Sequence, residues 1–538
     1  MVFFFYEKSI FEHILAYTNP SGPGLLPGGE ILPDESEYSD TPGVHWAPGS
    51  LDILTNHPAA LSEEEKKKKV DKYIEMFREV TGDPTEDKIK KLEELLASPD
   101  TLSIIDNVLR RLISDTKVNQ SILYRVCRYL FFRTGHRGVL KFCVAIMGLY
   151  GVKEDTELFE SISRHEEFTL YAIIAVMNNT IDTVDAWLRM AKNVTGWGRI
   201  HLVSRLSDYD RPDVKKFLLT EGCKNDIMEE YTACTIATAV DLHKILAAKK
   251  IDRNKYAGAG IVLSALVNAT IRPGPFEEID NYESAEKAVE EYIRHSGKMA
   301  VDLDDFIHLD TIRKVTLNID DGGCLEKLEW KEATLKYISD ATNEILERPC
   351  WKNKACKSLE SDDYQKRWNA VTVANIIGLQ IEKKIMNILE DNPLRPHLWY
   401  VLMQRANENN IDDILSLAGK KLKFKKIDKI KTADELNRDD KNKKTIIIPW
   451  NEMESATCNC LERILRELHR PAKMGWNVIK NALECPSSRT KLVAIGVLKA
   501  WNANVLDDDV KSQLEGLLDD PDDMVRIGAE NILRMVLK

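Results

Sequence analysis

The sequence of 538 residues lacks any run of about 18 apolar residues, which is the length that a membrane-spanning helix needs. It is also poor in strand signals, because the best candidate, residues 445–450 (TIIIPW), is short and contains a proline. No G-x-S-x-G, Walker A, H-E-x-x-H or G-x-G-x-x-G motif occurs, so the enzyme classes that these motifs mark have no support. An all-α protein without a common catalytic motif is therefore expected.

Positive charge is the minority charge, with 75 Lys and Arg against 86 Asp and Glu and a net charge of -11. This balance argues against a general binder of nucleic acid or of an anionic membrane, which normally has a basic face. The ten cysteines include no C-x-x-C pair, so no zinc framework is expected, and the chain is predicted to be cytoplasmic with reduced thiols. Residues 1–17 lack the charged start and cleavage site of an export signal, and they predict an amphipathic helix.

Amphipathic helices with short connections recur along the chain. In residues 519–536 (DDPDDMVRIGAENILRMV), Asp520 is predicted as the N-cap and Pro521 as part of the first turn. An apolar stripe then follows at helical spacing, consisting of Val525, Ala529, Ile532, Leu533 and Val536. Residues 207–222, 95–113, 368–379 and 381–393 show the same pattern, and short connections between such helices indicate antiparallel neighbours.

This closing stretch resembles the HEAT-repeat proteins, in which helix pairs stack into a solenoid. The resemblance is carried by Asp520, Pro521, Val525, Arg526 and Ala529, which match the pattern D-P-x-x-x-V-R-x-x-A. It is clearest over about the last ninety residues and weaker around 165–270, and no strict period emerges. The resemblance implies a HEAT-like α-solenoid of stacked antiparallel helix pairs.

Composition divides the chain into four predicted regions. Residues 1–60 contain a helix and a long irregular segment rich in Pro and Gly, and residues 61–418 are the main helical-repeat region. Residues 419–450 form a Lys-rich insertion or linker, with seven lysines from Lys420 to Lys431, and residues 451–538 are the C-terminal HEAT-like repeats. The lysine tract is interpreted as a solvated segment, with phosphate attraction as the alternative.

Three groups of residues are candidates for a site. His45, Asp52 and His57 are possible metal ligands, because imidazole and carboxylate suit zinc or iron, but packing against the solenoid or solvent exposure is the favoured interpretation. Arg125, Arg128 and Arg137 offer donors to a phosphate or an acidic peptide, or they form salt bridges between helices. Trp197, Arg199 and Arg205 fit a partner-binding face, because Trp and Arg are favoured at hot spots. Alternatively, Trp197 is buried and the arginines cap helix C-termini.

The leading hypothesis is a non-enzymatic scaffold or adaptor that binds a protein or peptide on the concave face of the solenoid, without a cofactor and without a membrane. One alternative is an enzyme with a metal or polar site near the N-terminal loop. The other is a nucleic-acid-binding HEAT-like protein, for which HEAT-like DNA glycosylases are an analogy that the acidic charge opposes.

Overall fold

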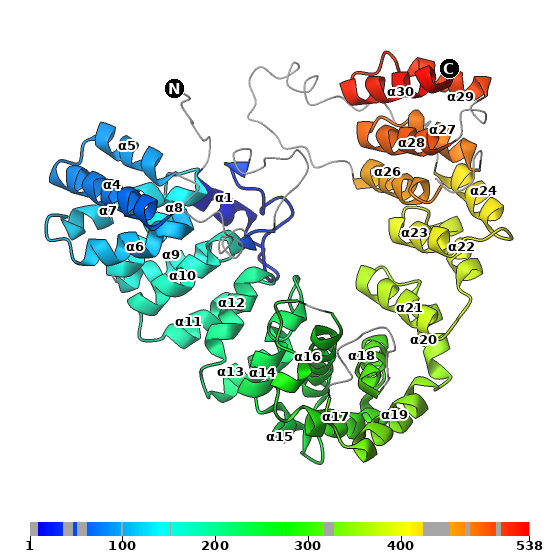
Figure 1. Cartoon of the computed structure of the whole chain (residues 1–538), viewed down its shortest axis with the longest axis horizontal. Helices are drawn as coiled ribbons and strands as arrows, with labels where there is room; N and C mark the ends of the chain where they lie inside the picture. The colour runs from blue at the N-terminus through cyan, green and yellow to red at the C-terminus, as the bar shows by residue number, and fades with distance from the viewer. Residues whose placement is uncertain are drawn as a thin grey trace. The chain divides into compact units, whose positions relative to one another are not determined.

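The computed structural model describes residues 9–35, 47–50, 62–97, 101–150, 152–272, 274–316, 328–422, 452–468, 474–501 and 507–536. The chain forms two compact units. Unit 1 comprises residues 1–301 and 308–347, and unit 2 comprises residues 302–307 and 348–538. Across the described ranges the structure contains helices and one isolated β-bridge, between Thr18 and Leu25, and no β-strand (Figure 1). The predicted all-α class is confirmed.

The first half of unit 1 consists of α1 (Ile10–Tyr17), α4 (Glu63–Gly82), α5 (Glu86–Leu96), α6 (Thr101–Ile113), α7 (Gln120–Phe131), α8 (Arg137–Tyr150), η1 (Lys153–Asp155), α9 (Thr156–Ile162), α10 (Glu166–Asn179), α11 (Thr183–Ala191) and α12 (Trp197–Leu206). The second half consists of α13 (Pro212–Phe217), η2 (Leu218–Gly222), η3 (Glu229–Tyr231), α14 (Ala233–Ala239), α15 (Leu242–Leu246), α16 (Arg253–Ile271), η4 (Ile279–Asn281), α17 (Ala285–Met299), η5 (Lys314–Thr316) and α19 (Glu332–Leu346). Helix α18 (Leu303–Arg313) contributes residues to both units.

Unit 2 continues with α20 (Cys350–Ser358), α21 (Tyr364–Ile376), α22 (Glu382–Asp391), α23 (Pro396–Gln404), α24 (Ile411–Lys421), α26 (Glu452–Leu465), α27 (Trp476–Leu483), α28 (Ser488–Ala500), α29 (Asp508–Gly516) and α30 (Asp523–Val536). Helices α23, α26, α28 and α30 pack on one another in succession, while α22, α24 and α27 form a second row beside them. Two rows of helices joined by short turns are the architecture of an α-solenoid, as the sequence predicted.

The same two-row order holds in unit 1, where α6, α8, α10 and α12 pack in succession and α7 and α11 lie against them. Gly148 of α8 allows a very close approach to α10, because a β-carbon at this position would lie 2.5 Å from the Cα of Ala175. The large buried side chains of the unit include Phe77, Phe142, Phe168, Tyr256 and Tyr292. In the part of the chain that is described, no helix has the length and apolarity to cross a bilayer.

Helix α30 confirms the predicted stripe and corrects its start. Val525, Ala529 and Ile532 are buried, and Leu533 is half-buried. The predicted N-cap Asp520 is wrong, because the helix begins at Asp523 and the carboxylate of Asp522 accepts hydrogen bonds from the N–H groups of Met524 and Val525. Asp520 is instead buried and accepts a hydrogen bond from Lys491 of α28.

Candidate functional site

Hydrogen bonds join the described N-terminal residues, 9–35 and 47–50, to later parts of unit 1. The N–H of Ile10 donates to the carbonyl of Thr134 at 2.9 Å, and the N–H of Gly24 donates to the carbonyl of Asn193 at 2.7 Å. The Nε2 of His165 lies 3.2 Å from the carbonyl oxygen of Glu30. The segment is therefore part of the folded unit.

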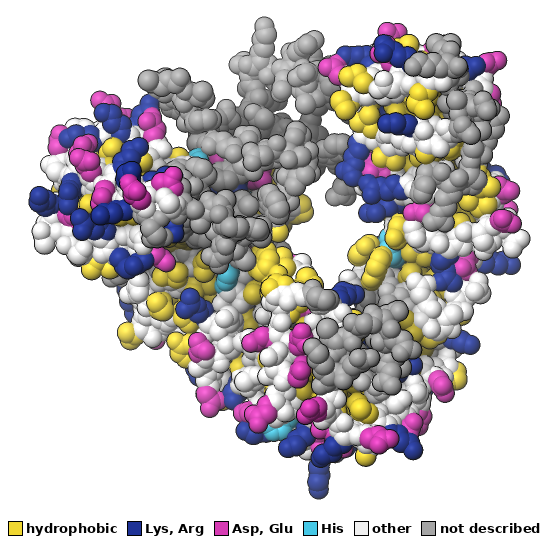
Figure 2. Space-filling view, in the orientation of Figure 1, with side chains coloured by type: hydrophobic (Ala, Val, Ile, Leu, Met, Phe, Trp, Pro, Cys, Tyr) yellow, Lys and Arg dark blue, Asp and Glu magenta, His cyan; other side chains and the backbone are white. Residues whose placement is uncertain are grey.

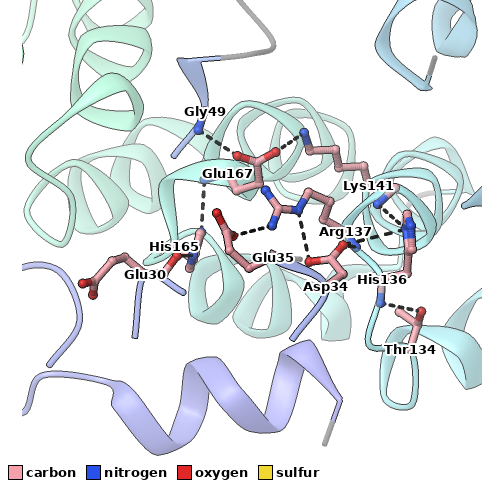
Figure 3. A network of polar contacts seen from close by, with 11 residues as sticks. Glu30, Asp34, Glu35, Gly49, Thr134, His136, Arg137, Lys141, His165 and Glu167 are labelled. Carbon is pink, nitrogen blue, oxygen red and sulfur yellow. Dashed lines mark hydrogen bonds and ion pairs between the residues drawn. The ribbon is translucent and has the colours of Figure 1, made fainter. Parts of the chain in front are cut away.

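A buried ion pair fixes the end of this segment to α8 (Figure 3). The backbone N–H of Arg137 donates to Asp34 at 2.7 Å, and its Nε donates to the same carboxylate at 3.1 Å. A second guanidinium nitrogen donates to Glu35 at 2.7 Å. Burial raises the pKa of Asp34 in spite of the opposing charge of Arg137. Both members of the pair are more than nine-tenths buried, so neither can be removed without leaving a buried charge in unit 1.

A second buried ion pair lies beside the first and holds residues 47–50. Lys141 Nζ donates to Glu167 Oε1 at 2.6 Å, and the N–H of Gly49 donates to Glu167 Oε2 at 2.9 Å (Figure 3). Burial would raise the pKa of Glu167, but Lys141 and Arg137 lower it to about 2. Gly49 has φ +80°, and a β-carbon there would lie 2.8 Å from the carbonyl oxygen of Glu166, so only glycine fits this position.

The pKa of His165 gives a test of this network by pH. Burial lowers that pKa from 6.5 to about 4, so the unfolded chain binds a proton between these values that the folded chain does not. Stability then falls as pH is lowered from about 6.5 to about 4. We expect the melting temperature to fall over this range, and His165→Asn, which keeps an N-cap acceptor at the start of α10, to reduce the slope. If the melting temperature of the His165→Asn variant fell as steeply with pH as that of the natural chain, the pH dependence would not come from His165.

Glu166, the neighbour of Glu167, builds the start of α12. Its carboxylate accepts hydrogen bonds from the N–H groups of Thr195 at 2.9 Å, Gly196 at 2.5 Å and Gly198 at 2.9 Å. A carboxylate at a helix N-terminus complements the helix dipole. A β-carbon at Gly198 would lie 2.6 Å from the hydroxyl oxygen of Thr169 in α10. The glycines on either side of Trp197 therefore allow α10 and α12 to come into close contact.

Three aromatic rings follow from this point, and we call them the aromatic row: Trp197, Tyr231 and Phe276. The ring centroids of Trp197 and Tyr231 are 4.9 Å apart, as are those of Tyr231 and Phe276, and both pairs meet edge to face. All three side chains are half-buried. They come from α12, from η3 and from the loop before η4. Figure 2 shows hydrophobic side chains gathered on this face, beside α12 and α16.

The predicted partner-binding residues Arg199 and Arg205 lie apart from one another. Arg199 is buried and donates to the carbonyls of Lys224 at 3.0 Å and Glu221 at 3.4 Å, which agrees with the alternative role of capping. Burial lowers its pKa. Arg205 is exposed on the last turn of α12. Trp197 alone of the three belongs to the aromatic row.

The predicted arginine group is not brought together, because Arg128 and Arg137 belong to two separate ion pairs and Arg125 belongs to neither. Arg128 of α7 lies 3.0 Å from Asp155, which also accepts a hydrogen bond from Tyr124 at 2.5 Å. Burial and this hydrogen bond raise the pKa of Tyr124 to about 12. Arg125 is exposed, and its Nε donates to the carbonyl of Ser121. Arg137 belongs to the buried pair with Asp34. The alternative of salt bridges between elements therefore describes Arg128 and Arg137 directly.

The predicted metal ligands His45, Asp52 and His57 lie outside the described residues, as does most of the Lys-rich tract. Within the described ranges, no group of three or more His, Cys, Asp or Glu side chains has a metal-binding arrangement. The metal site therefore stays a prediction, to be tested by metal analysis of the purified protein.

Sequence reasoning missed the residues that build this region. Asp34, Lys141, Glu166 and Glu167 show no local signal, because their partners lie 26 to 118 positions away in the chain. The stretch HEEF (165–168) places two acidic residues in the first turn of an apolar helix, but acidic residues are common at helix N-termini and do not by themselves mark Glu167 as buried.

No protein-family model matches the chain, and no curated protein matches it. Among solved structures, Kap95p with RanGDP is similar at 12% identity and a TM-score of 0.22, covering 91% of this chain and 72% of Kap95p. Kap121p is similar at 13% identity and a TM-score of 0.20, and the chain spans about half of its length, 49%. A circular tandem repeat protein gives 12% identity and a TM-score of 0.16, covering 88% of this chain and 97% of that one. Because these scores are low, the fold assignment rests on the helix packing described above.

Proposed function

We propose that this chain is a non-enzymatic helical-repeat scaffold that binds a protein or peptide partner on the concave face of unit 1. The observation that carries the proposal is the aromatic row, three half-buried rings in contact that come from α12, from η3 and from the loop before η4. Aromatic rings give large contact areas at low cost in side-chain entropy, and they are enriched at hot spots. Stacked helix pairs supply the extended surface that such a row needs.

The row is well positioned for this role. Glu166 holds the first turn of α12, and the buried pair of Lys141 and Glu167 holds residues 47–50 beside Trp197. Trp197 is thus held at a fixed helix start, so that little conformational entropy of this residue is lost when a partner docks. The seven buried free thiols among the described cysteines suit a reducing compartment, so we place this binding in the cytoplasm.

The test is site-specific photo-crosslinking in lysate of the source organism, with and without nuclease treatment. The photoreactive phenylalanine analogue benzoylphenylalanine replaces Tyr231 in the row or, as a matched control in the same unit, Tyr209, which is 39% exposed and packs against Trp187. We expect one defined protein to crosslink at Tyr231 and not at Tyr209. Trp197→Ala should lower the yield about tenfold, as loss of a hot-spot aromatic does.

Crosslinks of equal yield at Tyr231 and Tyr209 would contradict the proposed face, as would the absence of any crosslink at Tyr231. Loss of the crosslinked species on nuclease treatment would favour the nucleic-acid alternative. Circular dichroism of the Trp197→Ala variant shows whether its helices are intact, so that a binding defect is separated from unfolding.

A further inference from the structure

Unit 2 exposes a pair of large aromatic side chains on one face of α21. Tyr364 is 56% exposed and Trp368 is 42% exposed, and their rings are stacked with centroids 6.4 Å apart. Tyr364 and Trp368 are four positions apart in the sequence, so they share a helix face. Ile376 on the same helix is 41% exposed. Exposed aromatic surface of this kind marks interaction sites more often than single exposed apolar residues do.

A histidine from the neighbouring helix α23 lies against this pair. The ring of His397 is 5.2 Å from Tyr364 and 5.2 Å from Trp368, measured between centroids, and the residue is only 7% exposed. Neither ring nitrogen has a hydrogen-bond partner among the described residues. Buried polar groups are nearly always paired, so two unpaired nitrogens directly beneath exposed aromatic rings set this part of unit 2 apart from the rest of the described surface.

The charges near the histidine decide which ligand fits. The guanidinium of Arg367 lies 6.0 Å from the ring of Tyr364, and that of Arg463 on α26 lies 5.8 Å from the ring of Tyr400. Burial and these two positive charges lower the pKa of His397 to about 4. Aromatic rings alone would also suit a cation, but a cation would be repelled by both arginines.

The acidic groups nearby are engaged in other contacts. Asp362 pairs with Arg395 at 2.8 Å, and Asp363 caps α21 by accepting hydrogen bonds from the N–H groups of Gln365 and Lys366. Arg463 is exposed and has no acidic partner in the described part of the chain. Figure 2 shows Lys and Arg side chains next to hydrophobic ones over α21, α23 and α26. The surface therefore combines aromatic contact area with unneutralised positive charge.

We propose that the surface formed by Tyr364, Trp368, His397 and Arg463 binds an acidic, proline-containing linear segment of a partner protein. Proline rings pack on exposed aromatic faces, and His397 supports the two rings from below. A carboxylate of the segment pairs with Arg463. This surface lies in unit 2 and the aromatic row lies in unit 1, so either site can fail in its test without affecting the other.

The experiment measures fluorescence anisotropy of labelled peptides with the full chain. The probes are a peptide of about five Glu-Pro dipeptides and its Lys-Pro counterpart, both of which favour the extended proline-rich conformation. We expect saturable binding of the Glu-Pro probe and no binding of the Lys-Pro probe. Trp368→Ala and Arg463→Gln should each weaken binding about tenfold, and His397→Phe about fivefold, as loss of a central contact does.

Lys366→Gln is the matched control for charge, because this exposed residue is on α21 but not on the Tyr364 and Trp368 face. It should change the affinity less than about twofold, as removal of a distant surface charge does. Equal binding of both probes, no saturable binding of the Glu-Pro probe, or an affinity unchanged by Trp368→Ala would each overturn the proposal. An effect of Lys366→Gln as large as that of Arg463→Gln would also overturn it, because binding would then follow net charge alone.

Discussion

Replacing Lys141 with methionine is expected to lower the free energy of unfolding of unit 1 by about 3–5 kcal/mol, the cost of breaking a buried ion pair. The Nζ of Lys141 lies 2.6 Å from Glu167, and the two residues are 5% and 3% exposed. Methionine fills a similar volume but leaves the Glu167 carboxylate without its nearest positive charge. Hydrogen exchange followed by mass spectrometry measures the effect in peptides from α8 and α10, where exchange should be at least about a hundredfold faster.

The double variant Lys141→Met with Glu167→Gln removes both charges and is the informative comparison. Its free energy of unfolding should fall by less than that of Lys141→Met alone, because the double variant leaves no unpaired buried charge at this pair. Lys72→Met, at an exposed position of α4, should change stability by less than about 0.5 kcal/mol. A double variant as unstable as the single one would show that lost packing, and not the charge of Glu167, dominates.

The pKa of Glu167 determines how the stabilising effect of the Lys141–Glu167 ion pair depends on pH. Lys141 and Arg137 overcome the effect of burial and lower the pKa of Glu167 from 4.5 to about 2. The stabilising contribution is complete above pH 4.5, where the carboxylate is ionised in both states, and it is lost as pH falls toward 2. In the Glu167→Gln variant this part of the acid destabilisation should be absent.

The fold could be predicted from the sequence to the extent that its information is local. The apolar stripe of α30 and the existence of helices α21 and α22 follow from helical spacing, which depends on residues three or four positions apart. The expected pairing of these two helices does not follow, because α21 packs mainly on α20 and α22 packs on α23 and α24. The start of α30 was misplaced because several aspartates in a row offer competing caps, and packing of Asp520 against Lys491 decides between them. That contact joins α28 to α30 and has no local signal.

The candidate surfaces also combine features that are local in the sequence with contacts between residues far apart in the chain. Trp197 was a candidate because tryptophan is favoured at hot spots, but its neighbours Tyr231 and Phe276 are brought to it by the packing of later elements. The proximity of His397 to Trp368 is likewise a product of α23 packing beside α21, 29 residues further along the chain. Arg137 is of a residue type that is common at binding sites, and only its buried ion pair with Asp34 identifies its role as structural.

Helix packing in unit 1 makes a second prediction with a large effect, at Gly258 of α16. A β-carbon at this position would overlap the carbonyl oxygen of Leu219 in η2. A backbone carbonyl cannot turn away as a side chain does, so the two elements must separate. Gly258→Ala should therefore cost about 3 kcal/mol, the upper part of the usual range for overpacking, although alanine is the better helix former. Urea unfolding measures this loss of stability, and hydrogen exchange in peptides from α16 shows whether it arises at this helix.

Gly297 of α17 is the matched control, because it is also a helical glycine of unit 1 and a β-carbon there would meet no atom within 4 Å. Gly297→Ala should increase stability by about 0.5–1 kcal/mol, because alanine loses less backbone entropy on folding. Opposite signs for the same substitution would isolate the contact of α16 with η2 as the cause. If Gly258→Ala were as stable as the natural chain, the close contact of α16 with η2 would not constrain the packing of unit 1.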